Sequence, residues 1–300
     1  VIAVGGGAIM DLCKLLGCKR PDTVHNLYFK RFPVVHEKDV IAIPTTCGTG
    51  SECTNISVAI VKDEKDGVLT GGETKLGLVS DDIIPNKVCL IPELLKTLPY
   101  KPFACSAIDA LVHAVESALS PKATPYTKLF GYKAIEMIIR GYQTIAKKGP
   151  ESRFSLLNDF LLASNYAGLA FGTAGCAAVH ATSYPLGGKY HIAHGVSNAI
   201  LLAPVMRFNE PACRERLAAV YDRCMRGGEA TAEGKSAAVI ARLEQIVKHL
   251  DIPTSLTEFG APKGDLEALV ASGMEVTRLL VNNLRPVTPD DARRIYQEIL

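Results

Sequence analysis

The sequence predicts an α/β nucleotide-binding domain followed by an all-helical domain. Short apolar runs that end in glycine- or threonine-rich loops are concentrated in residues 1–98, whereas helical spacing of apolar residues dominates residues 99–300. Hydrophobic residues make up 48% of the 300 residues and charged residues 21%, so the chain can bury a sizeable core and is not disordered overall. We therefore expect two domains, 1–98 and 99–300, that share a wide cleft.

The first domain is expected to contain a parallel sheet. Val1–Val4 is a continuous apolar run, typical of a buried parallel strand, and apolar residues at helical spacing follow in Ala8–Leu16. Further strands are expected at Val40–Pro44, Ser57–Val61, Gly77–Val79 and Val88–Ile91, with a charged turn at Asp63–Gly67. Because the chain opens inside a strand and without Met, we expect that N-terminal sequence is missing and that the sheet is incomplete.

The helical half is expected to be divided by proline and glycine. Breaks are predicted at Ser120-Pro121, Gly149-Pro150, Pro185–Gly188, Pro204, Gly227-Gly228, Pro253 and Pro286.

Composition excludes several classes of function. The 33 basic and 31 acidic residues nearly balance, which argues against a nucleic-acid or anionic-membrane partner. The number of cysteines, nine, is odd and no pair has CxxC spacing, which argues against a disulfide framework or a zinc knuckle. With no apolar stretch of roughly 18 residues and no recognisable signal peptide, we expect a cytoplasmic protein with reduced thiols.

Two loops after predicted strands are suited to bind a nucleotide. Gly5-Gly6-Gly7 lies between a strand and a helix, where missing Cβ atoms and a helix N-terminus favour a diphosphate. The loop is not the GxGxxG fingerprint, and a tight turn that needs glycine only for its torsions is the alternative. Thr45–Glu52 follows the next strand with small hydroxyl residues, and Lys75 adds either a charge near the cofactor or a solvated surface lysine.

A second group of residues has the composition of a metal site. Asp109 and His113 are four residues apart in an apolar helical stretch, which puts them on one helix face. His180 and His194 flank a predicted break, and with the first pair they form an N₃O set for Fe²⁺ or Zn²⁺. His191 is a fifth candidate for the same pocket. The alternative is that these are unrelated core or surface histidines.

The chain resembles the iron-containing (group III) alcohol dehydrogenases over essentially its whole length. The matching blocks are AVGGGAIMDLCK (3–14), IPTTCGTGSECTN (43–55), IDALVHAVESALSPKATPYT (108–127), SNYAGLAFGTAGCAAVHATSYPLGGKYHIAHGVSNAILL (164–202) and LLVNNLRPVTPDD (279–291). The resemblance implies a dehydroquinate synthase-like architecture with the active site between the domains. It implies metal ligands at Asp109, His113, His180 and His194, and an NAD(P) site at Gly5, Gly6, Gly7, Asp11, Thr45, Thr46, Thr54 and Lys75.

Five segments favour one group within this family: PTTCGTGSE (44–52), LPYK (98–101), SPKATPYT (120–127), SNYAG (164–168) and LLVNN (279–283). With them the sequence looks most similar to the 4-hydroxybutyrate dehydrogenases. The implied reaction is reversible, metal-dependent hydride transfer between NAD(P) and 4-hydroxybutyrate or succinate semialdehyde, with Fe²⁺ or Zn²⁺ polarising the carbonyl. The substrate carboxylate needs a cation or amide donors, for which the candidates are Arg285, Asn282, Asn283 and Lys189. Family members commonly self-associate, so a homo-oligomer is expected.

Three positions depart from the family pattern. Tyr184 stands where many members carry a second histidine, which argues against a proton relay there, although the 4-hydroxybutyrate dehydrogenases also have a tyrosine at this position. Tyr184 and His191 are the candidates for the relay, and a role on the surface or behind the ligands is the alternative for His191. Ala8 replaces a usual serine in the glycine loop, and Ala193 replaces a usual proline before His194. Three other interpretations stay open: a different alcohol (a diol, lactaldehyde or an alkanol), a dehydroquinate synthase-like lyase, or a catalytically impaired fragment that lacks a complete cofactor domain.

Overall fold

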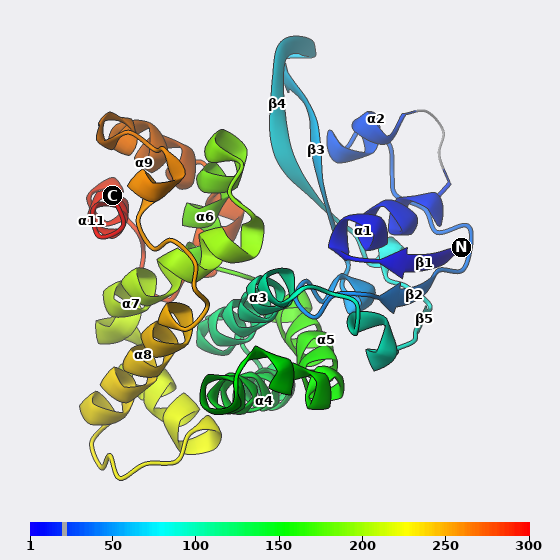
Figure 1. The fold of residues 1–300 in the computed structure, drawn as a ribbon. Helices are drawn as coiled ribbons and strands as arrows, with labels where there is room; N and C mark the ends of the chain where they lie inside the picture. Colours follow the sequence, from blue (N-terminus) through cyan, green and yellow to red (C-terminus); the bar gives the residue numbers. More distant parts are fainter. Residues whose placement is uncertain (20–22) are drawn as a thin grey trace.

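The computed structural model describes residues 1–19 and 23–300, and it has a small sheet region beside a large group of helices (Figure 1). Strands β1 (Ile2–Gly5), β2 (Ile41–Pro44) and β5 (Lys87–Val88) form a parallel sheet of order β1-β2-β5. Helix α1 (Gly7–Leu16) follows β1 after the glycine loop, and the short helix α2 (Val24–Tyr28) follows α1. This is the α/β part that the alternating apolar runs predict.

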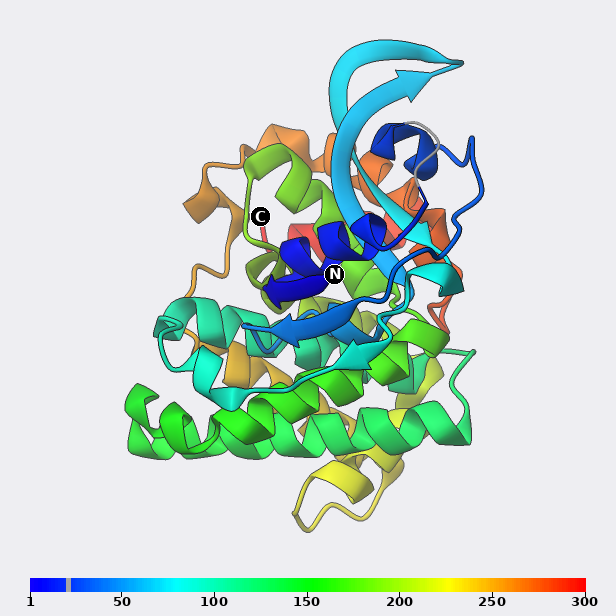
Figure 2. The same ribbon diagram turned by 90° about the vertical axis from the view of Figure 1, so that its right-hand side faces the viewer.

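A long antiparallel hairpin leaves the sheet region. It pairs β3 (Ile56–Lys65) with β4 (Val68–Val79), and in Figure 2 it rises away from the strands β1 and β2, which lie side by side. The turn was expected at Asp63–Gly67, but Asp63 to Lys65 are still in the strand. The charged side chains of this segment suit an exposed strand, because an antiparallel ribbon can leave one face in water.

The remainder of the chain is helical. Its main helices are α3 (Tyr100–Leu119), α4 (Pro125–Lys148), α5 (Leu157–Ala174), α6 (Ala178–Tyr190), α7 (His194–Cys224), α8 (Ala232–Lys248), α9 (Leu266–Met274), α10 (Thr277–Leu280) and α11 (Pro289–Gln297). Helix α3 is buried along almost its whole length and belongs to the largest hydrophobic core, whereas the sheet region has two small cores of its own. A helix buried on all sides is a fixed platform for the side chains that it carries.

Four further local predictions were wrong. The break expected at Pro185–Gly188 lies inside α6, and Pro204 lies inside α7, because neighbouring helices hold both segments helical. The strand expected at Val88–Ile91 is reduced to Lys87–Val88. Strand β1 is not buried on both faces, since Ile2 is 67% exposed and only Ala3 is fully buried.

No helix within residues 1–19 and 23–300 combines the length and apolarity needed to cross a bilayer.

Candidate active site

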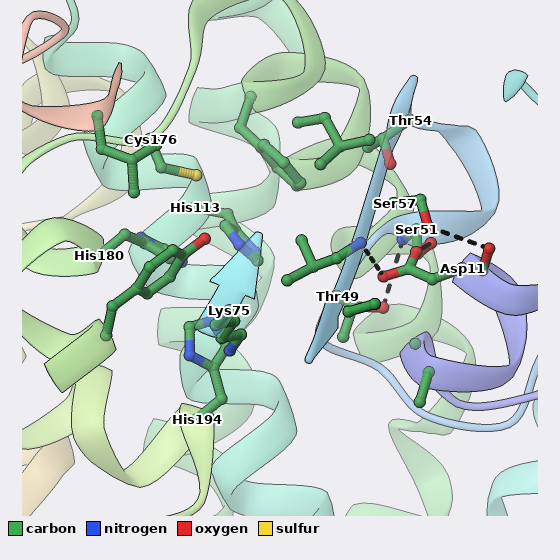
Figure 3. Close-up of a pocket in the computed structure, with 18 of the residues that line it drawn as sticks. Asp11, Thr49, Ser51, Thr54, Ser57, Lys75, His113, Cys176, His180 and His194 are labelled. Atoms are coloured by element: carbon green, nitrogen blue, oxygen red, sulfur yellow. Dashed lines mark hydrogen bonds between the residues drawn. The ribbon is translucent and has the colours of Figure 1, made fainter. Parts of the chain in front are cut away.

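A cavity of about 620 Å³ lies between the sheet region and the helices. Figure 3 shows its two sides: polar side chains from α1 and β3, including Asp11 and Ser57, face histidines that come from α3, α6 and α7. Lys75 of β4 lies on the histidine side, next to His194. The cavity therefore brings the predicted cofactor region and the predicted metal region into one space.

The two predicted nucleotide loops lie against each other at the carboxyl ends of β1 and β2. Gly5 pairs with Pro44 in the sheet, and the Thr45 N–H donates to the Gly5 carbonyl over 2.9 Å. A Cβ added at Gly7 would lie 2.7 Å from the Thr49 methyl, so only glycine allows this approach. Parallel sheets bind ligands at this edge, which is where the loops lie.

A buried lysine ties the second loop to the first helix, and the sequence analysis missed it. The Lys14 ammonium donates to Ser51 Oγ at 2.8 Å, to Thr54 Oγ1 at 3.1 Å and to the Ile56 carbonyl at 2.7 Å. Burial lowers the pKa of Lys14 to about 8, with Asp11 opposing the shift. Met10 and Lys14, one turn apart, are buried on α1, whereas Ile9 and Leu12 are 44% and 50% exposed, so the apolar spacing of this stretch points to a different face of the helix.

The predicted cofactor residues divide into two groups. Gly7, Asp11, Thr54 and Lys75 line the cavity, whereas Gly5, Gly6, Thr45 and Thr46 lie in the loops but do not line it. Asp11 is bonded within the protein, because its carboxylate accepts from the Val58 N–H at 2.9 Å and from the Ser51 hydroxyl. Its position is that of a group that fixes the loops.

Three of the four predicted metal ligands converge. Asp109 Oδ1 lies 3.6 Å from His180 Nε2 and 3.7 Å from His194 Nε2, although the three residues come from three different helices. The amide nitrogen of Asn198 lies between them, 2.6 Å from Asp109 Oδ1, 3.1 Å from His180 Nε2 and 3.3 Å from His194 Nε2. Asn198 follows His194 by one helical turn, so spacing could have identified it.

This cluster fits a divalent cation. One amide group has two hydrogens for three potential acceptors, and the buried Asn198 Oδ1 has no hydrogen-bond partner. A carboxylate and imidazole nitrogens are a donor set that suits Fe²⁺ or Zn²⁺. The residues present can therefore hold the metal that the sequence analysis predicts.

The fourth predicted ligand, His113, lies next to this cluster. Its ring stacks on those of His180 and Phe171, with centroids 4.6 and 4.1 Å apart, and its Nδ1 lies 3.2 Å from the Gly48 carbonyl. A ring nitrogen of His113 gathers with Cys176 Sγ and His180 rather than with Asp109 and His194. Cys176 is not among the predicted site residues, and its thiol lies beside His113 and His180.

Glu116 orients the cluster from behind and was not predicted. It is buried on the same helix as Asp109 and accepts from the Ala177 N–H at 3.0 Å, the Val179 N–H at 2.6 Å and His180 Nδ1 at 2.6 Å. A carboxylate behind a ligating histidine fixes the ring and its tautomer. Asp109, His113 and Glu116 recur at helical spacing, which is the signal that the sequence held.

Burial and charge set the protonation states of the cluster. Burial alone raises the pKa of Asp109, but the three nearby histidines outweigh it and hold that pKa far below its usual range. Burial lowers the pKa of His194 to about 3, so its imidazole is neutral and can act as a ligand. Burial also acts to lower the pKa of His180, yet Cys176, Asp109 and Glu116 raise it well above its usual value.

The two proton-relay candidates have different positions. Tyr184 lines the cavity, with its ring centroid 6.0 Å from that of His194 and the Lys75 ammonium 4.9 Å from its own. His191 is exposed in a left-handed conformation (φ 54°) at the end of α6, and it is not among the residues that line the cavity. His191 therefore lies away from Tyr184 and from the predicted metal ligands, because the end of α6 turns its side chain outward.

Comparison with known proteins gives matches along nearly the whole chain. Residues 1–92 match the family profile "Iron-containing alcohol dehydrogenase", and residues 103–300 match "Fe-containing alcohol dehydrogenase family, C-terminal". The chain is 38% identical to a 4-hydroxybutyrate dehydrogenase of Clostridium kluyveri, over 100% of this chain and 78% of that protein.

Two solved structures share the fold. A 1,3-propanediol oxidoreductase matches with a TM-score of 0.86 at 27% identity. The match covers 100% of this chain and 76% of that one. A sulfoacetaldehyde reductase from Bifidobacterium kashiwanohense, in complex with NAD⁺, has a TM-score of 0.83 at 26% identity, and covers 100% of this chain with 75% of its own.

The matches and the fold, a small parallel sheet beside a large helical region, together define an oxidoreductase. The chain belongs to the iron-containing alcohol dehydrogenase family. Its substrate is accordingly an alcohol or an aldehyde.

Proposed function

We propose that this enzyme interconverts 4-hydroxybutyrate and succinate semialdehyde with NAD as the hydride carrier. The observation that carries the proposal is the single cavity that joins the nucleotide loops to the Asp109, His180 and His194 cluster. The relative from C. kluyveri supports the substrate, and the neighbour solved with NAD⁺ supports the cofactor.

The metal region would act on the oxygen of the substrate. A divalent cation, Fe²⁺ in this proposal with Zn²⁺ as the alternative, would be held by Asp109, His113, His180 and His194 and would supply Lewis acidity. Glu116 keeps the His180 ring in place, and the low pKa of Asp109 keeps its carboxylate ionised.

The cofactor side would position the nicotinamide. The glycine loop and the Thr45–Glu52 loop form the diphosphate site, and Lys75 offers a positive charge inside the cavity, next to His194. Phe171 and Leu279 line the cavity with apolar surface, which excludes water from the path of the hydride. The chain thereby contributes distance and orientation.

Tyr184 is the proposed hydrogen-bond donor beside the metal region. Burial raises the pKa of its hydroxyl, while His180 and Arg278 oppose that shift, so the hydroxyl keeps its proton near neutral pH. A protonated hydroxyl can donate to a substrate oxygen. His191 has no part in this proposal.

The remaining predictions are carried forward as proposals. The division into domains 1–98 and 99–300 agrees with the start of α3 at Tyr100. All nine cysteines are free, which supports a reducing, cytoplasmic location. Self-association of this chain also stays a prediction.

Steady-state kinetics test the proposed reaction. The purified enzyme, loaded with Fe²⁺, is assayed with NAD and NADP against 4-hydroxybutyrate, 1,3-propanediol, 1-butanol and a long alkanol. We expect the highest kcat/KM with 4-hydroxybutyrate and NAD. A clear preference for an uncharged alcohol would refute the substrate but leave the family unaffected.

A further inference from the structure

The substrate's carboxylate needs a cation or amide donors, and three of the four predicted candidates lie away from the cavity. Lys189 is paired with Asp265 at 2.7 Å on the surface, and Asn283 is bonded to Asn209. The Arg285 guanidinium donates to the Phe208 carbonyl at 2.5 Å and lies over the Phe208 ring. None of the three lines the cavity.

Arg278 of α10 lines the cavity instead. No carboxylate in the described part of the chain forms an ion pair with it, whereas most other arginines pair with an aspartate or glutamate. Among residues 1–19 and 23–300, the two carboxylates that line the cavity are Asp11 and Asp109, which already accept hydrogen bonds from Val58 and Asn198. Arg278 thus has its positive charge available to a ligand.

The Arg278 guanidinium packs against Gly77, in the space that a larger side chain at this position would occupy; this space is called its seat. A Cβ added at Gly77 of β4 would lie 3.0 Å from Arg278 Nη2 and 3.5 Å from its Cζ, so the group lies directly against the strand. Gly77 has no positive φ and pairs with Val58 in the ladder. Backbone torsion therefore does not require glycine here, and the space that it leaves is filled by Arg278.

Tyr184 connects this seat to the metal region. Its ring centroid lies 6.0 Å from that of His194, and its hydroxyl is close enough to Arg278 for the positive charge to affect it. The Asn282 amide lines the same end of the cavity and donates to the Cys176 carbonyl at 2.9 Å, with Asn282 Oδ1 left without a partner. An acid whose alcohol end lies at the histidines would thus extend past Tyr184 toward Arg278.

We propose that Arg278 binds the carboxylate of a short ω-hydroxy acid and makes the enzyme selective for acids over uncharged alcohols. The planar guanidinium matches a carboxylate with two parallel N–H donors, which a lysine cannot do. This inference rests on the proposed function, because it explains how that substrate is recognised.

The test compares 4-hydroxybutyrate with 4-hydroxybutanamide, its uncharged isostere. In Arg278→Gln, kcat/KM for the acid should fall about 10- to 100-fold, mainly through a higher KM, because a hydrogen bond to a charged group is lost. The value for the amide should change less than about 3-fold, and the KM for NAD should not change. Arg278→Lys should recover part of the loss.

Two further variants sharpen the comparison. Gly77→Val keeps the arginine but occupies its seat, and valine suits a strand, so this variant should fold and lose acid selectivity in the same direction. Arg140→Gln removes an equal charge from the exposed face of α4, where Arg140 pairs with Glu136, and should change neither substrate's kinetics.

The outcomes distinguish this inference from the proposed function. If the unmodified enzyme does not prefer the acid to the amide, the proposed substrate is wrong. If it does prefer the acid and Arg278→Gln keeps that preference, only the role of Arg278 is refuted. An equal loss for acid and amide would show that Arg278 merely supports the cavity wall, which also refutes the inference.

Discussion

Replacing Glu116 with glutamine should weaken metal binding although it substitutes none of the proposed metal ligands. The carboxylate accepts three hydrogen bonds, from the N–H groups of Ala177 and Val179 and from His180 Nδ1. A glutamine keeps the size but has only one oxygen, so its NH₂ group must face at least one of these donors. Each bond to a charged group contributes about 1.5–3 kcal/mol, so we expect a loss of about 2–4 kcal/mol in the free energy of unfolding.

The same substitution should lower the affinity for the metal. Loss of a carboxylate behind a ligating histidine typically costs 10- to 100-fold in metal affinity, which corresponds to about 1.4–2.7 kcal/mol. Competition for Zn²⁺ against a chromophoric chelator measures the affinity at fixed pH, and urea unfolding in EDTA measures the stability of the metal-free chain.

Glu136→Gln is the matched control, since it removes the same charge from the exposed face of α4. It pairs there only with Lys133 and Arg140, and exposed pairs contribute about 0–1 kcal/mol. If Glu116→Gln binds Zn²⁺ as tightly as the unmodified enzyme, the Glu116–His180 bond does not orient the ligand and the reasoning fails.

Three other substitutions test separate parts of the site. His194→Ala should remove bound metal and activity together, as measured by elemental analysis beside kinetics, and full activity would contradict its assignment as a ligand. Gly195→Ala should cost about 1–3 kcal/mol in thermal unfolding, because its Cβ would lie 1.9 Å from the Cys105 carbonyl oxygen, whereas Gly188→Ala, with nothing within 4 Å in helix α6, should be neutral or stabilising. Lys14→Met tests the pH dependence: the pKa of Lys14 is lowered from 10.5 to about 8 in the fold, so the unfolded chain binds more protons between those values, and stability should rise with pH there by up to about 3 kcal/mol relative to the variant. Equal urea midpoint shifts for both proteins from pH 7.5 to 10.5 would contradict this account of Lys14.

Local patterns predicted the elements that are decided locally. The strand, glycine loop and helix around Gly5–Gly7 follow from an apolar run, three glycines and helical spacing, and the structure contains all three. The prolines at 185 and 204 misled the prediction, because the helices α6 and α7 continue through both. Packing against neighbouring helices outweighs the local cost of a proline, and that packing is not visible in a single sequence.

The site shows the same division between local and distant information. Asp109 and His113 could be paired because they are one turn apart on one helix. Glu116 continues that helical spacing, but the groups that it binds are 61 to 64 residues further along the chain, so its role is not visible locally. Arg278 was missed because its relation to Gly77 joins positions about 200 residues apart along the chain. Contacts between α10 and β4 depend on the tertiary fold.

The hairpin that carries Lys75 and Gly77 imposes a constraint on how this enzyme can change during evolution. Both residues lie on one face of β4, since alternate positions of a strand point the same way, and they pair with Ile60 and Val58. The insertion or deletion of one residue in β4 between Gly77 and the end of the strand at Val79 would turn both side-chain positions away from the cavity. The irregularity in the ladder at Lys62 and Glu64 lies toward the tip, so length changes beyond it can be absorbed there. Natural variation in length should therefore accumulate near the turn of the β3–β4 hairpin. Near the cavity, the number of residues in each strand should stay constant, so that Lys75 and Gly77 keep facing the cavity.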